Sequence, residues 1–293
     1  MTRTLLCAIA KKENHYIAEW VEHHLKLGFT HIVIYDNNDY EDERVEDVLQ
    51  PYIEDEKVTV ISWIGQKGQL TWGTPDRPFK STQIEAYNHC YYTQCKGFDW
   101  VMFLDIDEFL EIENGRKIRQ LLDDDLYCCY AYVVFCWKYF DDNGLIRVEN
   151  GNYSIKRFTH HRDNGVGDLW YNNTLFKTCI RTNLPHILIN SAHGITSEGP
   201  GFENNKKFNG CTVEGQRLYH DASRLSNPIH RIAWVNHYRY KTIEEFLQKA
   251  KRGWPDSFAD YSDMNLQEFF RGNDATREKL EYLESAGVIK IDK

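Results

Sequence analysis

The chain has 293 residues, which is enough for one large α/β domain with additions or for two small domains. Hydrophobic residues make up 42% of the sequence, so a substantial core can form, and the formal net charge of −9 argues against a general nucleic-acid binder. No apolar run approaches the length of a membrane span, and the short run Thr4–Ala10 leads straight into charged residues, unlike a signal peptide. We therefore expect a cytoplasmic protein.

The first sixty residues alternate between strand and helix patterns. Apolar residues at helical spacing from Ile17 to Leu25 predict a helix that Gly28 ends, and residues 45–49 mark a second, shorter helix. Strand–helix alternation of this kind predicts right-handed crossovers and a parallel sheet. The strands of that sheet are expected at 4–10, 30–35 and 58–61.

The rest of the chain mixes strand patterns, helix signals and one long polar segment. Thr82–Glu85 and Thr242–Glu245 can each form a capping box that opens a helix, and a last helix at 275–286 ends at Gly287. Residues 194–228 are rich in Gly, Asn and charged residues and predict a long loop that acts as a closing lid. Further strands are expected at 130–139, 174–181, 187–189 and 232–235.

Residues 100–110 are the most informative part of the sequence. The apolar run from Trp100 to Leu104 ends in two carboxylates, Asp105 and Asp107, and apolar Phe109 follows them. Ligands in open α/β sheets bind at the carboxyl ends of the strands, and two hard oxygen ligands there suit Mg²⁺ or Mn²⁺. Asp-x-Asp alone is common and is typical of solvated turns, but the flanking apolar residues indicate carboxylates that are held in place by packing.

Five ordered motifs carry a resemblance to a known enzyme family. They are Ala10–Asn14, Glu19–His24, Gly28–Asn37, Phe103–Phe109 and Asn236–Phe246. Together they resemble bacterial family 2-like glycosyltransferases close to family 92. The resemblance implies an α/β, GT-A (Rossmann-like) fold with a mixed, mostly parallel central sheet flanked by helices. It places the GT-A domain in residues 1–253 and a helical C-terminal extension, packed on that domain, in residues 254–293.

The resemblance also implies a divalent metal ion, Mn²⁺ or Mg²⁺, and a set of residues that bind it and the sugar donor. The metal ligands would be Asp105, Asp107 and His237, with His193 as the alternative histidine. Solvated loop charges are the other interpretation of Lys11 and Glu13, and a turn or helix cap is the other interpretation of Asp36. The implied donor-binding residues are Ala10, Lys11, Glu13, Asp36, Lys80, Gln83, Asp105, Lys241, Lys249 and Arg252, of which Lys249 and Arg252 would hold the donor diphosphate.

The implied reaction is metal-dependent transfer of a sugar from a UDP-sugar, with galactose as the candidate, to a glycan or lipid-linked glycan acceptor. Inversion at the anomeric carbon requires a general base near the acceptor, and Glu198 and Asp168 are the two candidates. A lipid-linked acceptor would bring the protein to the inner face of the membrane. Three other functions stay open. They are a non-catalytic sugar-nucleotide or glycan-binding protein, a nucleotidyltransferase, although residues 10–14 lack the Gly-rich loop of that class, and a metal-dependent phosphohydrolase. The sequence does not give the oligomeric state.

Overall fold

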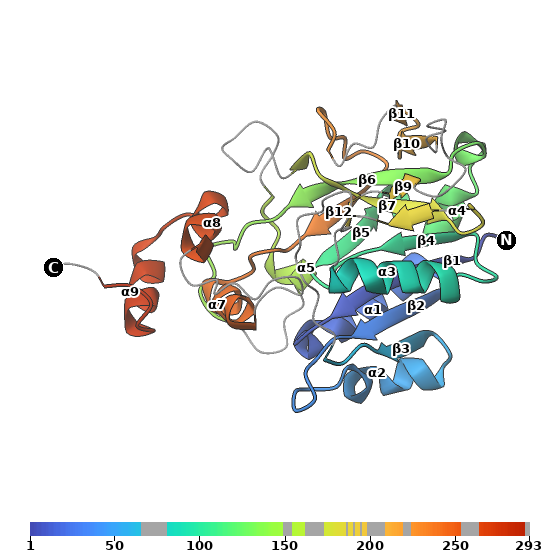
Figure 1. Cartoon of the computed structure of the whole chain (residues 1–293). Coiled ribbons are helices and arrows are strands. Elements are labelled where there is room, and N and C mark those ends of the chain that lie inside the picture. The colour runs from blue at the N-terminus through green and yellow to red at the C-terminus, as the bar shows by residue number, and fades with distance from the viewer. Residues whose placement is uncertain are drawn as a thin grey trace, which may run out of the picture.

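The first apolar run of the chain forms a central strand of the main sheet (Figure 1). β1 (Thr4–Ala10) is buried along its whole length, as expected of a strand that is covered on both faces. It pairs in parallel with β2 (His31–Asp36) and with β4 (Trp100–Phe103), and β2 pairs in parallel with β3 (Val58–Ser62). The predicted parallel arrangement is therefore confirmed. The computed structural model describes residues 1–65, 81–148, 154–161, 173–185, 187–189, 191–193, 195–197, 209–218, 224–252 and 264–290.

Helices cover both faces of this parallel unit. The core on one face contains alternate residues of β1 together with side chains of α1 (Asn14–Leu27) and α2 (Val45–Glu54), and the core on the other face contains side chains of α3 (Thr82–Thr93). Gly28 ends α1 in the left-handed conformation, with φ of 103°. The predicted cap of α3 is wrong by one residue, because the hydroxyl of Ser81, and not that of Thr82, accepts from the backbone N–H of Ile84.

Antiparallel strands extend the sheet on the side of β4. β7 (Phe176–Arg181) pairs in antiparallel fashion with β4 and with β6 (Tyr132–Tyr139). β12 (Ala233–His237) runs parallel to β6 and antiparallel to β5 (Glu108–Ile112). Within the described residues the main sheet has ten strands, which include β10 (Gly210–Thr212) and β11 (Arg217–Leu218). Its principal path runs β11-β10-β6-β7-β4-β1-β2-β3. The expected mixed α/β architecture, with a partly parallel sheet flanked by helices, is confirmed.

Three short strands lie inside the segment predicted to be a long loop. β9 (Ile195–Ser197) pairs with β8 (Ile187–Ile189), while β10 (Gly210–Thr212) pairs with β6 and with β11 (Arg217–Leu218). The prediction of an unbroken loop over 194–228 is wrong at these strands, since strands of two or three residues are too short to show a period-2 pattern. Residues 194, 198–208 and 219–223 lie outside the described part of the chain.

The C-terminal region is helical and packs on the elements before it (Figure 1). The predicted capping box before α7 (Ile243–Arg252) is confirmed: the N–H of Glu245 donates to Thr242 Oγ1 over 3.2 Å, and the N–H of Thr242 donates to the Glu245 carboxylate over 3.1 Å. Phe269 of α8 (Met264–Gly272) packs on Phe246, with ring centroids 5.0 Å apart. Lys279 of α9 (Arg277–Ser285) forms a buried ion pair with Asp142, which follows β6.

Four short helical segments complete the described secondary structure. They are η1 (Glu113–Gly115), α4 (Ile118–Leu122), η2 (Asp125–Tyr127) and α5 (Ser154–Arg157). In the described part of the chain, every helix is too short or too polar to cross a membrane.

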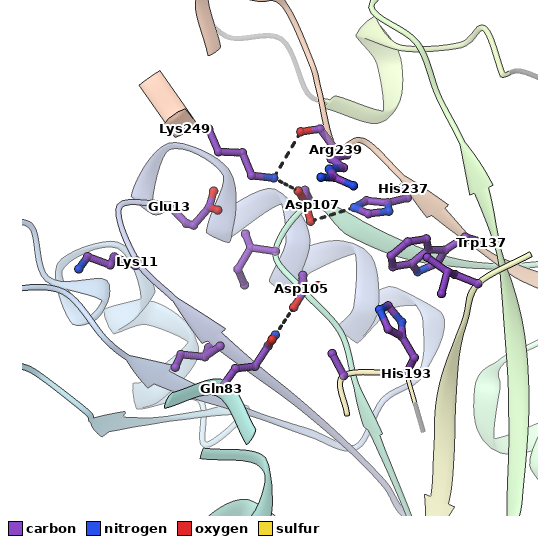
Figure 2. Close-up of a pocket in the computed structure, with 14 residues that line it drawn as sticks. Lys11, Glu13, Gln83, Asp105, Asp107, Trp137, His193, His237, Arg239 and Lys249 are labelled. Carbon is purple, nitrogen blue, oxygen red and sulfur yellow. Dashed lines mark hydrogen bonds and ion pairs between the residues drawn. The ribbon is translucent and has the colours of Figure 1, made fainter. Parts of the chain in front are cut away.

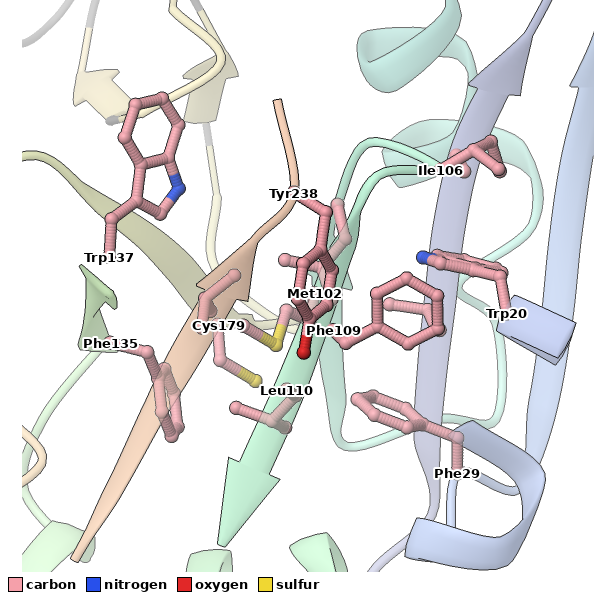
Figure 3. Close-up of a cluster of buried hydrophobic side chains, with 14 of the residues drawn as sticks. Trp20, Phe29, Met102, Ile106, Phe109, Leu110, Phe135, Trp137, Cys179 and Tyr238 are labelled. Atoms are coloured by element: carbon pink, nitrogen blue, oxygen red, sulfur yellow. The ribbon is translucent and has the colours of Figure 1, made fainter. Parts of the chain in front are cut away.

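A packed aromatic core supports the turn between β4 and β5 (Figure 3). Trp20 of α1 is fully buried, and its indole N–H donates to the carbonyl of Glu108 over 2.8 Å. Phe109 packs edge-on against Tyr238, with centroids 5.6 Å apart. Ile106, which lies between the two aspartates, is itself buried. Because close-packed side chains surround it on several sides, this turn is held in one conformation.

Candidate active site

The two aspartates of the Asp-x-Asp motif lie in a tight turn that its own residues close. The backbone N–H of Glu108 donates to the carbonyl of Asp105 over 3.0 Å, and the N–H of Asp105 donates back to the Glu108 carboxylate over 2.8 Å. The buried side chains of Leu104 and Ile106, one on each side of Asp105 in the sequence, hold the turn against the hydrophobic core. The sequence-based expectation that packing fixes these carboxylates is therefore confirmed.

Asp105 is bound by three side chains from two neighbouring elements. Its Oδ2 lies 2.9 Å from Nζ of Lys177 on β7, and its Oδ1 accepts from Gln83 and Tyr87 of α3 over 2.6 and 3.3 Å. Burial acts to raise the pKa of Asp105, but the Lys177 ammonium outweighs it and the pKa is lowered. Asp105 is therefore an anchored carboxylate, with about a third of its side chain (34%) still exposed.

Asp107 faces the opposite direction, toward β12 and α7. Its Oδ1 lies 3.6 Å from Nε2 of His237, and its Oδ2 forms an ion pair with Lys249. The N–H of Tyr238 donates to the Asp107 carbonyl over 2.9 Å, which fixes the turn against the end of β12. Burial acts to raise the pKa of Asp107, yet the nearby Lys249 and His237 hold it well below its usual range. Asp107 is therefore a buried carboxylate that stays ionised.

Aromatic and imidazole rings form one wall beside Asp107 (Figure 2). The ring of Trp137 on β6 lies between His237 and His193, with centroids 4.2 and 4.9 Å away. Burial lowers the pKa of His237, and burial followed by the charge of Lys177 lowers the pKa of His193 to about 3, so both rings are neutral at pH 7. Nδ1 of His193 donates to the carbonyl of Phe176 over 3.2 Å, which leaves its Nε2 with a lone pair.

These side chains surround a cavity of about 290 Å³ at the carboxyl ends of β1 and β4 (Figure 2). Its position agrees with the rule that ligands in open α/β sheets bind at the carboxyl ends of the strands. The volume is close to the lower end of the range for small-molecule sites. The cavity is lined by Ile9, Lys11, Glu13, Gln83, Asp105, Ile106, Asp107, Trp137, Leu175, Ala192, His193, His237, Arg239 and Lys249.

Most of the residues singled out from the sequence meet at this cavity, and some do not. Ala10 and Lys241 are buried away from its lining, and Lys241 lines a second cavity instead. Arg252 is the last residue of α7, and its side chain lies outside the described part of the structure. Lys80, Asp168 and Glu198 lie outside the described residues. The predicted residues that line the first cavity are Lys11, Glu13, Gln83, Asp105, Asp107, His193, His237 and Lys249.

Asp36 has a structural role at the end of β2. Its Oδ1 accepts from the backbone and side-chain N–H groups of Asn38 over 3.0 and 2.8 Å. Its Oδ2 accepts from the backbone N–H of Val45, the first residue of α2, over 3.2 Å. The carboxylate thus closes a turn and caps a helix, which is the alternative that the Asp-Asn-Asn-Asp pattern left open.

Two candidate metal ligands, and not a full ligand set, lie together among the described residues. Asp107 and His237 face each other, whereas Asp105 is turned toward Lys177. Within that part of the chain, no three His, Cys, Asp or Glu side chains gather around one point. A carboxylate oxygen and a neutral imidazole nitrogen are nevertheless ligands that Mn²⁺ accepts, and Mg²⁺ sites commonly have one or two protein carboxylates completed by water and substrate phosphates.

Lys177, Trp137 and Arg239 belong to the site but were not predicted from the sequence. Lys177 is fully buried between Asp105 and Glu108, 2.9 Å from each carboxylate, although in the sequence it is one lysine in a β-prone run. Trp137 and Arg239 also line the cavity. Arg239 lies inside the motif Asn236–Phe246, so the motif itself contained a signal for it. Lys177 and Trp137 had no such signal, because only the pairing of β6 with β7 brings them to the site.

Residues 6–125 match the family model for glycosyltransferase family 92, which confirms the resemblance read from the motifs. A glycosyltransferase family 92 protein of Ricinus communis is 25% identical over 249 residues, covering 84% of this chain and 37% of the relative. One of Arabidopsis thaliana is 26% identical over 275 residues, covering 89% of this chain and 39% of the relative. The chain thus spans less than two fifths of the length of these two relatives.

Two solved structures show a distant likeness. TarS of S. aureus is 13% identical, with a TM-score of 0.36, and the match covers 62% of this chain and 28% of TarS. The mannosyltransferase PcManGT from Pyrobaculum calidifontis, in complex with GDP-Man and Mn²⁺, is 12% identical, with a TM-score of 0.31, and the match covers 46% of this chain and 35% of PcManGT.

Proposed function

We propose that the chain is a metal-dependent glycosyltransferase that moves a sugar from a UDP-sugar to a glycan acceptor. One observation carries the proposal: Asp107, His237 and Lys249, from three separate parts of the chain, line one cavity, and Asp107 contacts the other two. The match of residues 6–125 to family 92 supports sugar transfer as the reaction class. A buried, ionised carboxylate beside a neutral imidazole supports the binding of a divalent cation, which would in turn bind the donor diphosphate.

Asp107 and His237 would hold this cation, Mn²⁺ or Mg²⁺, and water and the donor diphosphate would complete its coordination. When bound, it would supply positive charge that stabilises the departing diphosphate. Lys249 forms an ion pair with Asp107 at the same cavity. We propose that Lys249, Arg239 and Arg252 supply positive charge to the donor diphosphate.

The remaining polar residues of the cavity would orient the donor. Asp105, held by Lys177 and Gln83, would accept from ribose hydroxyls. Lys11 and Glu13 line the side of the cavity nearest β1, where the nucleotide would lie. Lys80, which lies outside the described residues, is a further proposed donor contact.

Transfer with inversion needs a base that takes the proton of the acceptor hydroxyl as its oxygen attacks the anomeric carbon and UDP leaves. Glu198 and Asp168 are the proposed bases. We also propose galactose as the sugar, a glycan or lipid-linked glycan as the acceptor, and a cytoplasmic location at the inner face of the membrane.

A screen of UDP-sugars with Mn²⁺ tests this function. Purified protein is incubated with each donor and an acceptor mixture, and released UDP is measured with and without EDTA. We expect one donor to give UDP release that depends on both acceptor and metal. Saturable UDP-sugar binding without turnover would instead identify a non-catalytic binding protein. Formation of UTP and a sugar 1-phosphate from a UDP-sugar and added pyrophosphate would identify a nucleotidyltransferase.

A further inference from the structure

A second cavity, of about 240 Å³, adjoins the first. It lies between the start of α1, the segment that follows β12, and α7. Glu13, Arg239 and Lys249 line both cavities, and Figure 2 shows all three around Asp107. An extended ligand in the first cavity could therefore reach the second.

Lys241 is the distinctive residue of this second cavity. It is 93% buried, since only 7% of it is exposed, and it lines the second cavity but not the first. Among the described residues its ammonium has no ion pair and no hydrogen bond. The ammonium lies over the ring of Tyr16 in a cation–π contact, with Nζ 3.1 Å from the ring centroid. Its backbone has a φ of 55°, which is uncommon for a residue with a side chain.

Several charges around Lys241 are already paired: Lys12 forms an ion pair with Asp42, and Lys249 forms one with Asp107. The lining of the second cavity includes the cations Lys12, Arg239, Lys241 and Lys249 and the carboxylates Glu13 and Glu245. Glu245 is already neutralised from outside the cavity, because Arg157 donates to both of its oxygens over 2.7 and 2.8 Å. Burial lowers the pKa of Lys241, as expected for an ammonium whose burial is not fully offset by partners.

We propose that the second cavity binds an anionic group, a phosphate or a carboxylate, carried by the acceptor. This assignment to the acceptor rests on the proposed glycosyltransferase function. The donor diphosphate is matched by Asp107, His237 and Lys249 in the first cavity, so an anion at Lys241 would be a second charged group. A buried ammonium beside an empty volume fits such a group because a charge-assisted hydrogen bond would offset its burial.

Inorganic phosphate is the probe that tests this site. Phosphate binding to the full chain is measured by calorimetry with Mg²⁺, with and without saturating UDP. We expect saturable binding that persists when UDP is bound. In Lys241→Met this binding should weaken at least about tenfold, because the variant loses one hydrogen bond to a charged group. Lys26→Met is the matched control, because Lys26 is 78% exposed in a surface pair, and it should bind phosphate as the wild type does.

Three results would overturn the proposal: no saturable phosphate binding to the wild type, equal binding in Lys241→Met, or competition between phosphate and UDP. Lys241→Asn provides a second variant whose side chain tolerates a positive φ, should the methionine variant not fold. Phosphate binding does not depend on turnover. Intact phosphate binding in a protein that turns over no UDP-sugar would therefore reject the proposed reaction and still support an anion site.

Discussion

Replacing Lys177 with methionine is expected to lower the free energy of unfolding by about 3–5 kcal/mol, the usual effect of removing one partner from a buried charge cluster. Lys177 is completely buried, and its Nζ lies 2.9 Å from Asp105 Oδ2 and from Glu108 Oε2. Methionine would fill a similar volume but leave both carboxylates without their cation. Urea unfolding of the two proteins at pH 7 measures the difference.

Two comparisons separate this effect from a general loss of charge. Lys26→Met removes an exposed lysine from an i,i+4 pair and should change stability by less than about 0.5 kcal/mol. Burial raises the pKa of Glu108 well above its usual value, and the charge of Lys177 opposes that shift. Adding Glu108→Gln to Lys177→Met should therefore recover part of the loss, since it removes one of the two carboxyl groups left without their cation. A loss below about 1 kcal/mol in Lys177→Met would show that the cluster is not held together by its cation.

The Glu245→Gln variant is also expected to lose about 3–5 kcal/mol at pH 7, because it leaves the Arg157 guanidinium buried without a carboxylate. Burial acts to raise the pKa of Glu245, but the hydrogen bonds of Arg157, together with the charges of Lys241 and Arg157, lower it to about 2. The folded state therefore holds this proton less tightly than the unfolded chain, where the pKa is about 4.3. The Glu245–Arg157 ion pair therefore stabilises the folded state fully above about pH 4.3, and this stabilisation is lost as the pH falls through about 2.

Urea unfolding of wild type and Glu245→Gln across pH 7 to 3 tests this dependence. The stability difference between the two proteins should be constant down to about pH 4.5 and then shrink. Glu281→Gln, which alters an exposed pair with Arg277, should follow the wild type within about 0.5 kcal/mol. If the stability difference between wild type and Glu245→Gln grows as the pH falls, Glu245 is not an ionised partner of Arg157 in the folded state.

The parts of the fold that could be predicted from the sequence are those that local pattern determines. The continuous apolar run of β1, the helical spacing that Gly28 ends and the capping box at Thr242 were all recognised, because each depends on residues close together in the chain. Short strands that depend on distant partners, such as β10 beside β6, were missed. Ser81 and Thr82 are chemically similar caps, so only the backbone geometry decided between them.

In the candidate site too, residues in local motifs could be predicted and residues that depend on distant partners could not. Asp107, His237 and Lys249 were chosen from ordered motifs, and the pairing of β12 with β5 brings them together. Lys177 could not be recognised, since nothing in its neighbourhood distinguishes a lysine that ends in the core from one that reaches solvent. Asp36 shows the opposite difficulty: a carboxylate at the end of a strand resembled a ligand-binding group, and its oxygens bind Asn38 and Val45.

The central claim is that Asp107 binds the metal ion through which the donor is held, and UDP binding over a Mn²⁺ titration tests it most directly. Asp124→Asn is the matched control, because Asp124 is 43% exposed and does not line either cavity. We predict Mn²⁺-dependent UDP binding in the wild type and in Asp124→Asn, and binding at least about tenfold weaker in Asp107→Asn, with the fold retained. Binding of UDP by Asp107→Asn with wild-type affinity and the wild-type requirement for Mn²⁺ would contradict the account.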